Sequence, residues 1–412
     1  MREADTSPQD GGRRRLVPRL SPVEAVALAY LAASLFLISV SGRRYYWILP
    51  ECGLIVAKMA LWAVPAVAVA IVADVFGWAA RSRRLVLLAY YLLLTIALIG
   101  TQLEASLIRT HYLSRMTRMV REVGVLSLAC MVLLAVALAV GWYRHRERTV
   151  EVLRGQAVQL VYALRLLVAL VFLFVAYSNL KAAIPLLRPG LYDGWFYRLD
   201  RVLMLGHDPL ELVSRIRWEW FATLMKRSYF FLFFFVLFGL SGAFVFRSAL
   251  YMERTMLALL LVYVVGTMGY YLAPSVGPAF FNETSRLFRH TADSPLKLSL
   301  YNAYVQFCRH PYTAAVFPFN GLAAFPSLHV AQMAVLLYSL SRIEKALVWM
   351  LVLPCILLTV ATVYLGWHYV VDIPGGLLVA WIAGLLSRQI YKRWPLAARS
   401  PATVVDSLQH VG

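Results

Sequence analysis

The chain is poor in charged residues. Only 15% of its 412 residues are Asp, Glu, Lys or Arg, whereas soluble domains usually carry about 25%. Hydrophobic residues make up 61% of the chain, and many apolar runs approach the roughly 20 residues that cross a hydrocarbon core. This composition excludes an ordinary soluble protein and predicts an all-α, polytopic membrane helical bundle.

Acidic residues are scarcer than basic ones, with 21 Asp and Glu against 40 Lys and Arg. The arginines cluster at the ends of apolar runs, as in "GGRRRLVPRL", "RSRR" and "RHRER". This pattern is typical of cytoplasmic anchoring, and no nucleic-acid-binding motif accompanies it. We therefore expect membrane lipids and no nucleic acid as partners. Because no carboxylate cluster suits magnesium, we also expect no metal and no cofactor.

Cysteine is rare too. The spacing of Cys52, Cys130, Cys308 and Cys355 fits neither a zinc site nor a dense disulfide framework. Cys130 and Cys355 are expected in the membrane core. Cys52 and Cys308 are expected to face the same compartment, and the sequence does not decide whether a disulfide joins them.

Hydropathy predicts ten spans, with boundaries uncertain by several residues. The predicted spans are residues 23–41, 53–76, 85–108, 123–143, 158–178, 227–246, 254–273, 326–343, 345–366 and 369–388. We divide the chain into an accessory four-span unit (1–150), a six-span catalytic core (151–395) and a cytoplasmic tail (396–412).

The distribution of Lys and Arg in short loops predicts that both termini are cytoplasmic. Residues 179–226, 274–325 and the corner at 366–369 then share the extracytoplasmic face. The first of these segments is rich in Trp, Tyr and Arg, which is typical of amphipathic helices lying along a membrane interface.

The segment "TVYLGWHYVVDIPGG" (362–376) places His368 and Asp372 four residues apart. Residues at that spacing share a helix face, so the carboxylate can accept a proton from one imidazole nitrogen. The other nitrogen then offers a lone pair for nucleophilic attack. Taken alone, the motif fits a purely structural His–Asp pair equally well.

The segment "AAFPSLHVAQ" (323–332) starts another predicted span. We expect Pro326 at the first helical position, where its missing N–H costs little. Free backbone donors, the helix dipole and the Ser327 hydroxyl would favour a bound anion beside His329. A Pro-started helix with an incidental histidine is the alternative. However, two membrane crossings return the chain to the same surface at His368, which favours a shared site.

"FPSLHVA" and "YLGWHYVVDIPGG" resemble the second and third motifs of the type 2 phosphatidic acid phosphatase superfamily. The Pro-Ser-x-His and His-Tyr-x-x-Asp patterns are similar to the branch with inositol-phosphorylceramide synthase and sphingomyelin synthase. "GYYLAPSVGPAFF" (269–281) is similar to that branch's first motif, and "LYDGWFYRLDRVLMLGHDP" (191–209) to a segment of its bacterial members. The resemblance covers residues 158–388 and a six-helix core.

The resemblance implies a bacterial inner-membrane enzyme in which His368 attacks phosphorus and forms a phosphohistidine, while Asp372 orients it. His329 would protonate the leaving oxygen and later deprotonate the acceptor. Superfamily phosphatases usually carry an Arg where this chain has Thr362, and a Gly where it has Leu328. Both departures favour the transferase branch.

The phosphate-binding cation is not assigned by these motifs. "KAAIPLLRP" (181–189) matches the phosphatase first-motif spacing through Lys181 and Arg188, although it lies unusually early in the chain and is also explained as an interfacial anchor. The predicted phosphate- or substrate-binding residues are Ser327, Lys181, Arg188, Arg286 and Tyr364.

The sequence thus predicts a lipid phosphotransferase that moves a phospho-headgroup to a lipid alcohol or polyol. A lipid phosphate phosphatase, with water as acceptor, shares the chemistry up to the phosphoenzyme. A proton-coupled transporter is a second alternative, but it predicts ionisable residues at mid-membrane rather than at span ends. An inactive scaffold is the third.

Overall fold

The described part of the chain is entirely helices and connecting turns. A computed structural model describes residues 20–92, 131–291 and 295–394, except the single positions 62, 80, 83, 90, 133, 248 and 320. No β-strand occurs among these residues. This confirms the predicted all-α class. The span predicted at 85–108 lies largely outside the described residues, as do Cys130 and the first part (123–130) of the span predicted at 123–143. The rest of that span contains the apolar helix Leu134–Arg144.

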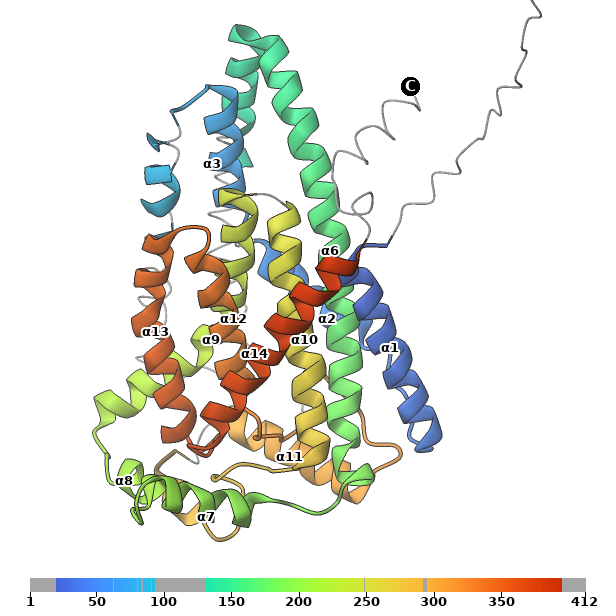
Figure 1. Cartoon of the computed structure of the whole chain (residues 1–412), viewed down its shortest axis with the longest axis vertical. Helices are drawn as coiled ribbons and strands as arrows, with labels where there is room; N and C mark the ends of the chain where they lie inside the picture. The colour runs from blue at the N-terminus through green and yellow to red at the C-terminus, as the bar shows by residue number, and fades with distance from the viewer. Residues whose placement is uncertain are drawn as a thin grey trace, which may run out of the picture.

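The six predicted core spans correspond to six helices packed as a bundle (Figure 1). They are α6 (Arg146–Leu187), α9 (Glu219–Phe246), α10 (Ala249–Leu272), α12 (Leu328–Ser341), α13 (Lys345–Tyr364) and α14 (Asp372–Arg393). The helix α6 is much longer than its predicted span and runs past the bundle at one end (Figure 1). Together with α1 (Pro22–Val40), the helices α6, α10, α13 and α14 are long and apolar enough to cross a membrane.

The N-terminal helices pack against this bundle. The span predicted at 53–76 is instead two helices, α2 (Leu49–Leu61) and α3 (Val64–Val75). The break falls where Pro65 enters the first turn of α3, because proline has no N–H to continue the preceding helix. Buried residues of α1 and α2 belong to the same apolar cluster as those of α6 and α10, so the accessory unit shares the core of the bundle.

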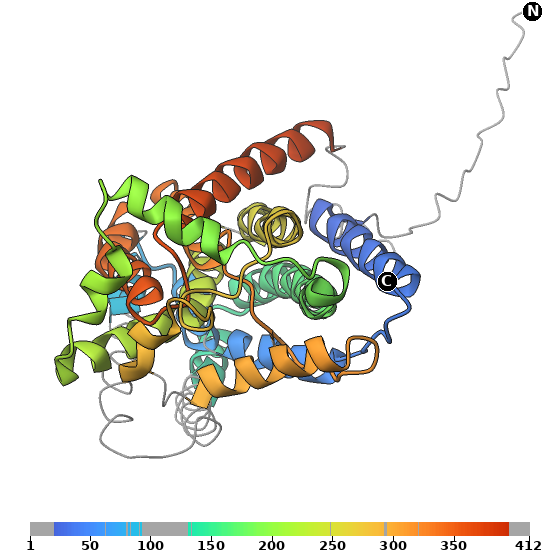
Figure 2. The same cartoon turned by 90° about the horizontal axis from the view of Figure 1, so that it is seen from below.

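Short helices cover one end of the bundle, which we call the capped end (Figures 1 and 2). They are α7 (Asp193–Leu203), α8 (Pro209–Ser214), the 3-10 helix η1 (Ser285–Thr291) and α11 (Pro295–Arg309). They arise from the two long segments predicted to share one face. The opposite end, which we call the distal end, holds the α9–α10 and α12–α13 turns (Figure 1).

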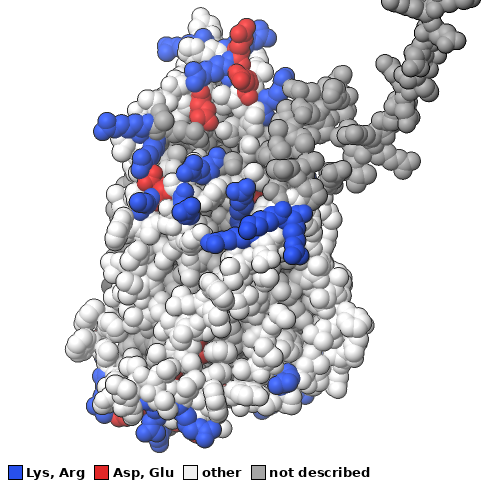
Figure 3. Space-filling model, in the orientation of Figure 1, with Lys and Arg blue, Asp and Glu red and all other residues white. Residues whose placement is uncertain are grey.

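The surface between the two ends is apolar. Figure 3 shows Lys and Arg gathered toward both ends of the molecule, with a broad band almost free of charge between them. Exposed residues of the core helices include Trp349, Leu353 and Trp381. An exposed apolar belt of this kind is more favourable in contact with lipid than with water, which supports a membrane protein. Cys52 and Cys308 form no bridge: the first is buried, the second is exposed, and both are free thiols.

Candidate active site

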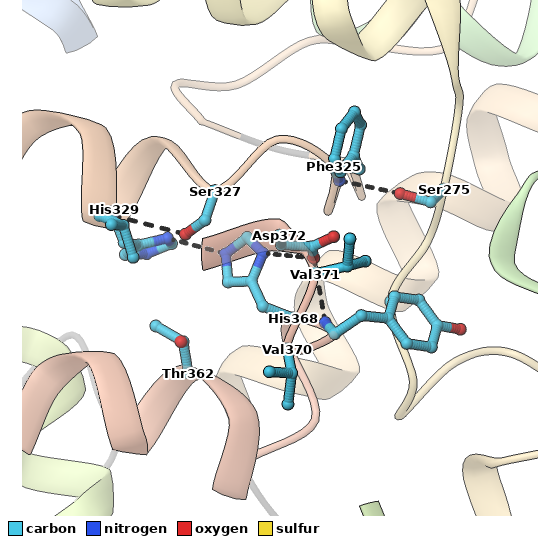
Figure 4. Close-up of polar contacts among 12 residues, drawn as sticks. Ser275, Phe325, Ser327, His329, Thr362, His368, Val370, Val371 and Asp372 are labelled. Atoms are coloured by element: carbon cyan, nitrogen blue, oxygen red, sulfur yellow. Dashed lines mark hydrogen bonds and ion pairs between the residues drawn. The ribbon is translucent and has the colours of Figure 1, made fainter. Parts of the chain in front are cut away.

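The two histidines singled out in the sequence meet at the capped end. His329 is the second residue of α12, and His368 lies in the turn between α13 and α14. The Nδ1 atom of His329 is 3.0 Å from the Nε2 atom of His368 (Figure 4). Helices α12 and α13 therefore deliver both imidazoles to one place, as two successive crossings predict.

Asp372 fixes the proton positions in this pair. Its Oδ2 atom lies 3.0 Å from Nδ1 of His368 and also accepts the backbone N–H of Tyr369 at 3.0 Å (Figure 4). A carboxylate oxygen can only accept, so Nδ1 of His368 carries the proton. The Nε2 lone pair is then free to accept a hydrogen bond from Nδ1–H of His329, and it is the atom available for attack.

Burial keeps the His368 ring neutral. Only 3% of the residue is exposed. Burial lowers the pKa of His368 to about 3. A backbone hydrogen bond involving Ala324 opposes this lowering, and the positive charge of Lys181 adds to it. A neutral imidazole at ordinary pH retains the lone pair that a nucleophile needs.

Two glycines allow the three motif segments to approach this closely. A Cβ on Gly376 would lie 2.4 Å from the Ser327 carbonyl oxygen, so only glycine lets the start of α14 contact the start of α12. Gly277 has φ +92°, and a Cβ there would lie 2.6 Å from the Trp367 carbonyl oxygen. The first motif thereby packs directly against the turn that carries His368.

The start of α12 differs from the prediction in one detail. Pro326 does not occupy the first helical position; Ser327 is the N-cap, and α12 begins at Leu328. The Ser327 hydroxyl accepts the N–H of Val330 at 3.5 Å. Because first-turn N–H groups lack intrahelical acceptors, the start of α12, which carries His329, is a place where an anion is favoured.

Of the three predicted cations, Lys181 is the one placed against the histidines. Its charge acts on both His329 and His368, and its Nζ atom is 3.5 Å from the Phe319 carbonyl oxygen. Arg188 and Arg286 are exposed, and their role in phosphate binding stays a prediction.

Tyr364 and Thr362 are both fully buried on α13. The Tyr364 hydroxyl donates to the Ile216 carbonyl oxygen at 2.9 Å, which ties α13 to the connection between α8 and α9. The Thr362 carbonyl oxygen accepts the N–H groups of Trp367 and His368 at 2.9 and 3.1 Å. Thr362 therefore anchors the turn that carries His368 through its backbone carbonyl.

Three further residues near the site carry weak sequence signals. The Tyr229 ring lies 4.9 Å from the His329 ring and stacks on Trp367 at 5.3 Å. The Nζ atom of Lys297 lies 5.8 Å from the centre of the Trp367 ring. Burial lowers the pKa of Lys297 to about 7, and Lys226 adds to this lowering.

Trp367 could have been found from its place beside His368 in the third motif. Tyr229 is hidden in a Phe-rich run, and Lys297 lies in a loop segment without a motif. Within the described residues, no group of three or more His, Cys, Asp or Glu side chains is arranged to hold a metal ion.

Comparison with known protein families agrees with this geometry. Residues 194–386 match the family model of the PAP2 superfamily. The match includes both histidines and Asp372, and it supports a phosphatase or phosphotransferase acting on lipid phosphates. The comparisons with curated proteins and with solved structures found no match.

Proposed function

On the premise of this PAP2 match, we propose that the protein is a membrane lipid phosphotransferase. It takes a phosphoryl or phospho-headgroup unit from a membrane lipid and passes it to a lipid alcohol or a polyol through a phosphohistidine. The observation that carries this proposal is the hydrogen-bonded series His329–His368–Asp372, with both links at 3.0 Å.

In the first step, Nε2 of His368 attacks phosphorus. A P–N bond forms and the P–O bond to the leaving group breaks. His329, as the imidazolium, gives its Nδ1 proton to the leaving oxygen and becomes neutral. The two ring nitrogens are only 3.0 Å apart, so the entering phosphorus must separate them. His329 then moves from covering the nucleophile to facing the leaving group.

Charge on the non-bridging oxygens needs stabilisation during this step. The Lys181 ammonium acts on both histidines, and the first-turn N–H groups of α12 add partial positive charge. In the second step the acceptor hydroxyl attacks phosphorus, His329 accepts its proton, and the P–N bond to His368 breaks. The site is restored to its starting protonation state.

Two features favour a transferase over a phosphatase. Leu328 replaces the glycine that is common in the phosphatases, and Thr362 replaces their arginine. Both residues are buried, which favours a drier site around the phosphoenzyme, where a lipid hydroxyl competes better with water. The phosphatase reading, with water as acceptor, is the alternative that the experiment has to separate.

The test uses the purified full-length protein in lipid vesicles with a phospholipid labelled at phosphorus. Ceramide, diacylglycerol or no acceptor is added in parallel, and His368→Ala is the control. A labelled lipid product that requires the acceptor supports the transferase. Release of inorganic phosphate alone supports the phosphatase and overturns the transferase. No product from any donor, or full activity of the control, contradicts both.

A further inference from the structure

The turn that carries His368 is held by a helix outside the three motifs. Within residues 365–371, the first four backbone N–H groups donate to carbonyl oxygens of α13, and that of Tyr369 donates to Asp372. The N–H groups of Val370 and Val371 donate to the two carboxylate oxygens of Asp200, each at 2.8 Å. One carboxylate of α7 thus binds the last two free amides of the catalytic turn.

A second carboxylate of α7 binds two motif segments at once. Asp193 accepts the backbone N–H groups of Val276 and Gly277 at 3.0 and 2.9 Å. It also accepts the hydroxyl of Tyr369 at 3.0 Å. Asp193 therefore joins the first motif to the residue that directly follows His368.

The orientation of α7 is unusual for a surface helix. Asp193 and Asp200 are seven residues apart, which is two helical turns, and neither is exposed to solvent. Trp195 and Val202 are instead 57% and 70% exposed. Phe196 and the two acids of α7 face inward, whereas Trp195 and Val202 share the outward face with the exposed Arg198 and Arg201. This helix therefore fits a lipid interface on one side and the His368 turn on the other.

We propose that Asp193 and Asp200 are positioning residues that hold the His368 turn in the geometry for attack on phosphorus. This inference rests on the proposed function. The inference assigns a positioning role to the segment 191–209, which the sequence analysis had noted by resemblance alone. A displacement of about 1 Å at a reacting group can lower a rate by about 100-fold, so loss of this support is expected in the chemical step rather than in substrate binding.

The carboxylate form is required for this task. An ionised Asp200 accepts with both oxygens, whereas an asparagine has one acceptor oxygen and an NH₂ group that would face an N–H donor. Asp200→Asn should therefore push the turn away from α7. Asp193→Asn should loosen Tyr369 in the same way, and Tyr369→Phe should remove only that side-chain contact.

Asp208 provides a matched control on the same segment. It caps α8 by accepting the N–H groups of Leu210 and Glu211 at 2.9 and 3.1 Å, and it bonds Tyr197. Asp208→Asn thus weakens the same surface layer without touching the His368 turn. It should lower the thermal midpoint and leave kcat close to that of the wild type.

The experiment measures single-turnover formation of the phosphoenzyme, steady-state kcat and KM, and thermal unfolding for each variant. We expect Asp200→Asn to form the phosphoenzyme about 10- to 100-fold more slowly, with KM within about twofold of wild type. Tyr369→Phe should show a smaller loss in the rate of phosphoenzyme formation. This variant provides the test of the inference if Asp200→Asn does not fold.

Equal kcat losses in Asp200→Asn and Asp208→Asn, or a loss confined to KM, would overturn the inference. A wild-type rate of phosphoenzyme formation in both Asp200→Asn and Tyr369→Phe would do the same. If wild type itself forms no phosphoenzyme with any lipid donor, the proposed function has failed, which is a distinguishable outcome.

Discussion

The two ends of the bundle both bury carboxyl groups, but they bind different partners with them. At the capped end, Asp193, Asp200 and Asp372 accept backbone N–H groups from the connecting segments. At the distal end, Glu253 lies beside the hydroxyls of Tyr162 and Tyr391.

An ion pair on the distal side of the molecule likewise joins side chain to side chain, rather than side chain to backbone. Arg165 of α6 donates to both oxygens of Glu24 on α1, at 2.9 and 2.8 Å. Bonds to successive backbone amides fix the path of a turn, whereas side-chain pairs join helices that can still shift slightly. Substitution of the capped-end carboxylates that bind the His368 turn should therefore change rates, and substitutions at the distal end should change stability.

The sharpest contrast is between His368→Ala and Glu253→Gln. Loss of the nucleophile should reduce kcat by roughly 10⁴-fold or more, by analogy with the loss of a catalytic triad member. Glu253→Gln should keep kcat within about twofold of wild type, since the residue is on the opposite end of α10. Steady-state assays in vesicles check both kcat values. Comparable losses of kcat in the two variants would contradict the proposed difference between the two ends.

Asp372→Asn should have the next largest effect. The amide can no longer hold the proton on Nδ1 of His368 as a carboxylate does, so part of the population adopts the wrong tautomer. We expect a kcat loss of about 10²- to 10⁴-fold, with the upper value set by the corresponding change in a catalytic triad. Single-turnover kinetics measure it. A loss below tenfold would mean that Asp372 is only structural.

Lys181→Ala should lower kcat/KM by about 10- to 100-fold, because the cation that we propose binds the phosphate is lost. Lys181→Arg should recover part of this loss, since it keeps the charge. Arg254→Ala removes a distal-end cation that packs on Tyr391, and serves as the control with unchanged kinetics. If the Lys181 and Arg254 variants behave alike, another cation binds the phosphate.

Acid should lower the activity that depends on the carboxylates of the capped end. Burial raises the pKa values of Asp193 and Asp200 to about 6, so both begin to protonate as the pH falls through about 6. The titratable groups that face them are Tyr369 in the turn, Asp372 on α14, Tyr304 on α11 and Asp208 beside α8. We expect kcat to fall below pH about 6.

The free energy of unfolding should change with pH in the opposite direction to kcat. A raised carboxyl pKa means that the folded state binds the proton more tightly than the unfolded state. The contribution of these two groups to the free energy of unfolding is therefore present near pH 4 and lost as pH rises through 6. In Asp200→Asn the acid limb of the kcat profile should become shallower, because only Asp193 of the two still titrates near pH 6. A limb of unchanged steepness would show that Asp200 does not contribute to it.

The smallest effect on activity is expected from Arg165→Met. It removes two charge-assisted hydrogen bonds to Glu24 and should lower the free energy of unfolding by about 1–3 kcal/mol. Turnover at a temperature where the variant is folded should match wild type. Thermal unfolding and activity measured on the same preparation check this, and a rate loss without a stability loss would contradict the division between the two ends.

The helical class and the six core helices could be predicted because apolar runs of span length leave few other solutions in a membrane. The sequence also predicted that His329 and His368 lie at the same membrane face, since the number of crossings between them decides which face each one reaches. The break between α2 and α3 was missed because hydropathy averages over Pro65, although the proline itself was a usable signal.

The supporting contacts were less accessible to sequence reasoning. Asp193 and Asp200 lie more than 160 residues from the turn that they bind, and an acid on an amphipathic helix is ordinarily solvated. Only the packed structure shows that these acids face inward. Similarly, Lys181 is distinguished from Arg188 and Arg286 by burial, which the spacing of "KAAIPLLRP" does not encode.

The most direct test of the central claim is to trap the covalent intermediate. The His329→Ala variant, given a labelled lipid phosphate ester with a good leaving group, should form the phosphoenzyme but release it slowly, because no base activates the acceptor. We predict acid-labile, base-stable label on the peptide containing His368, and none in His368→Ala. Label on another residue, or brisk turnover in His368→Ala, would contradict the account.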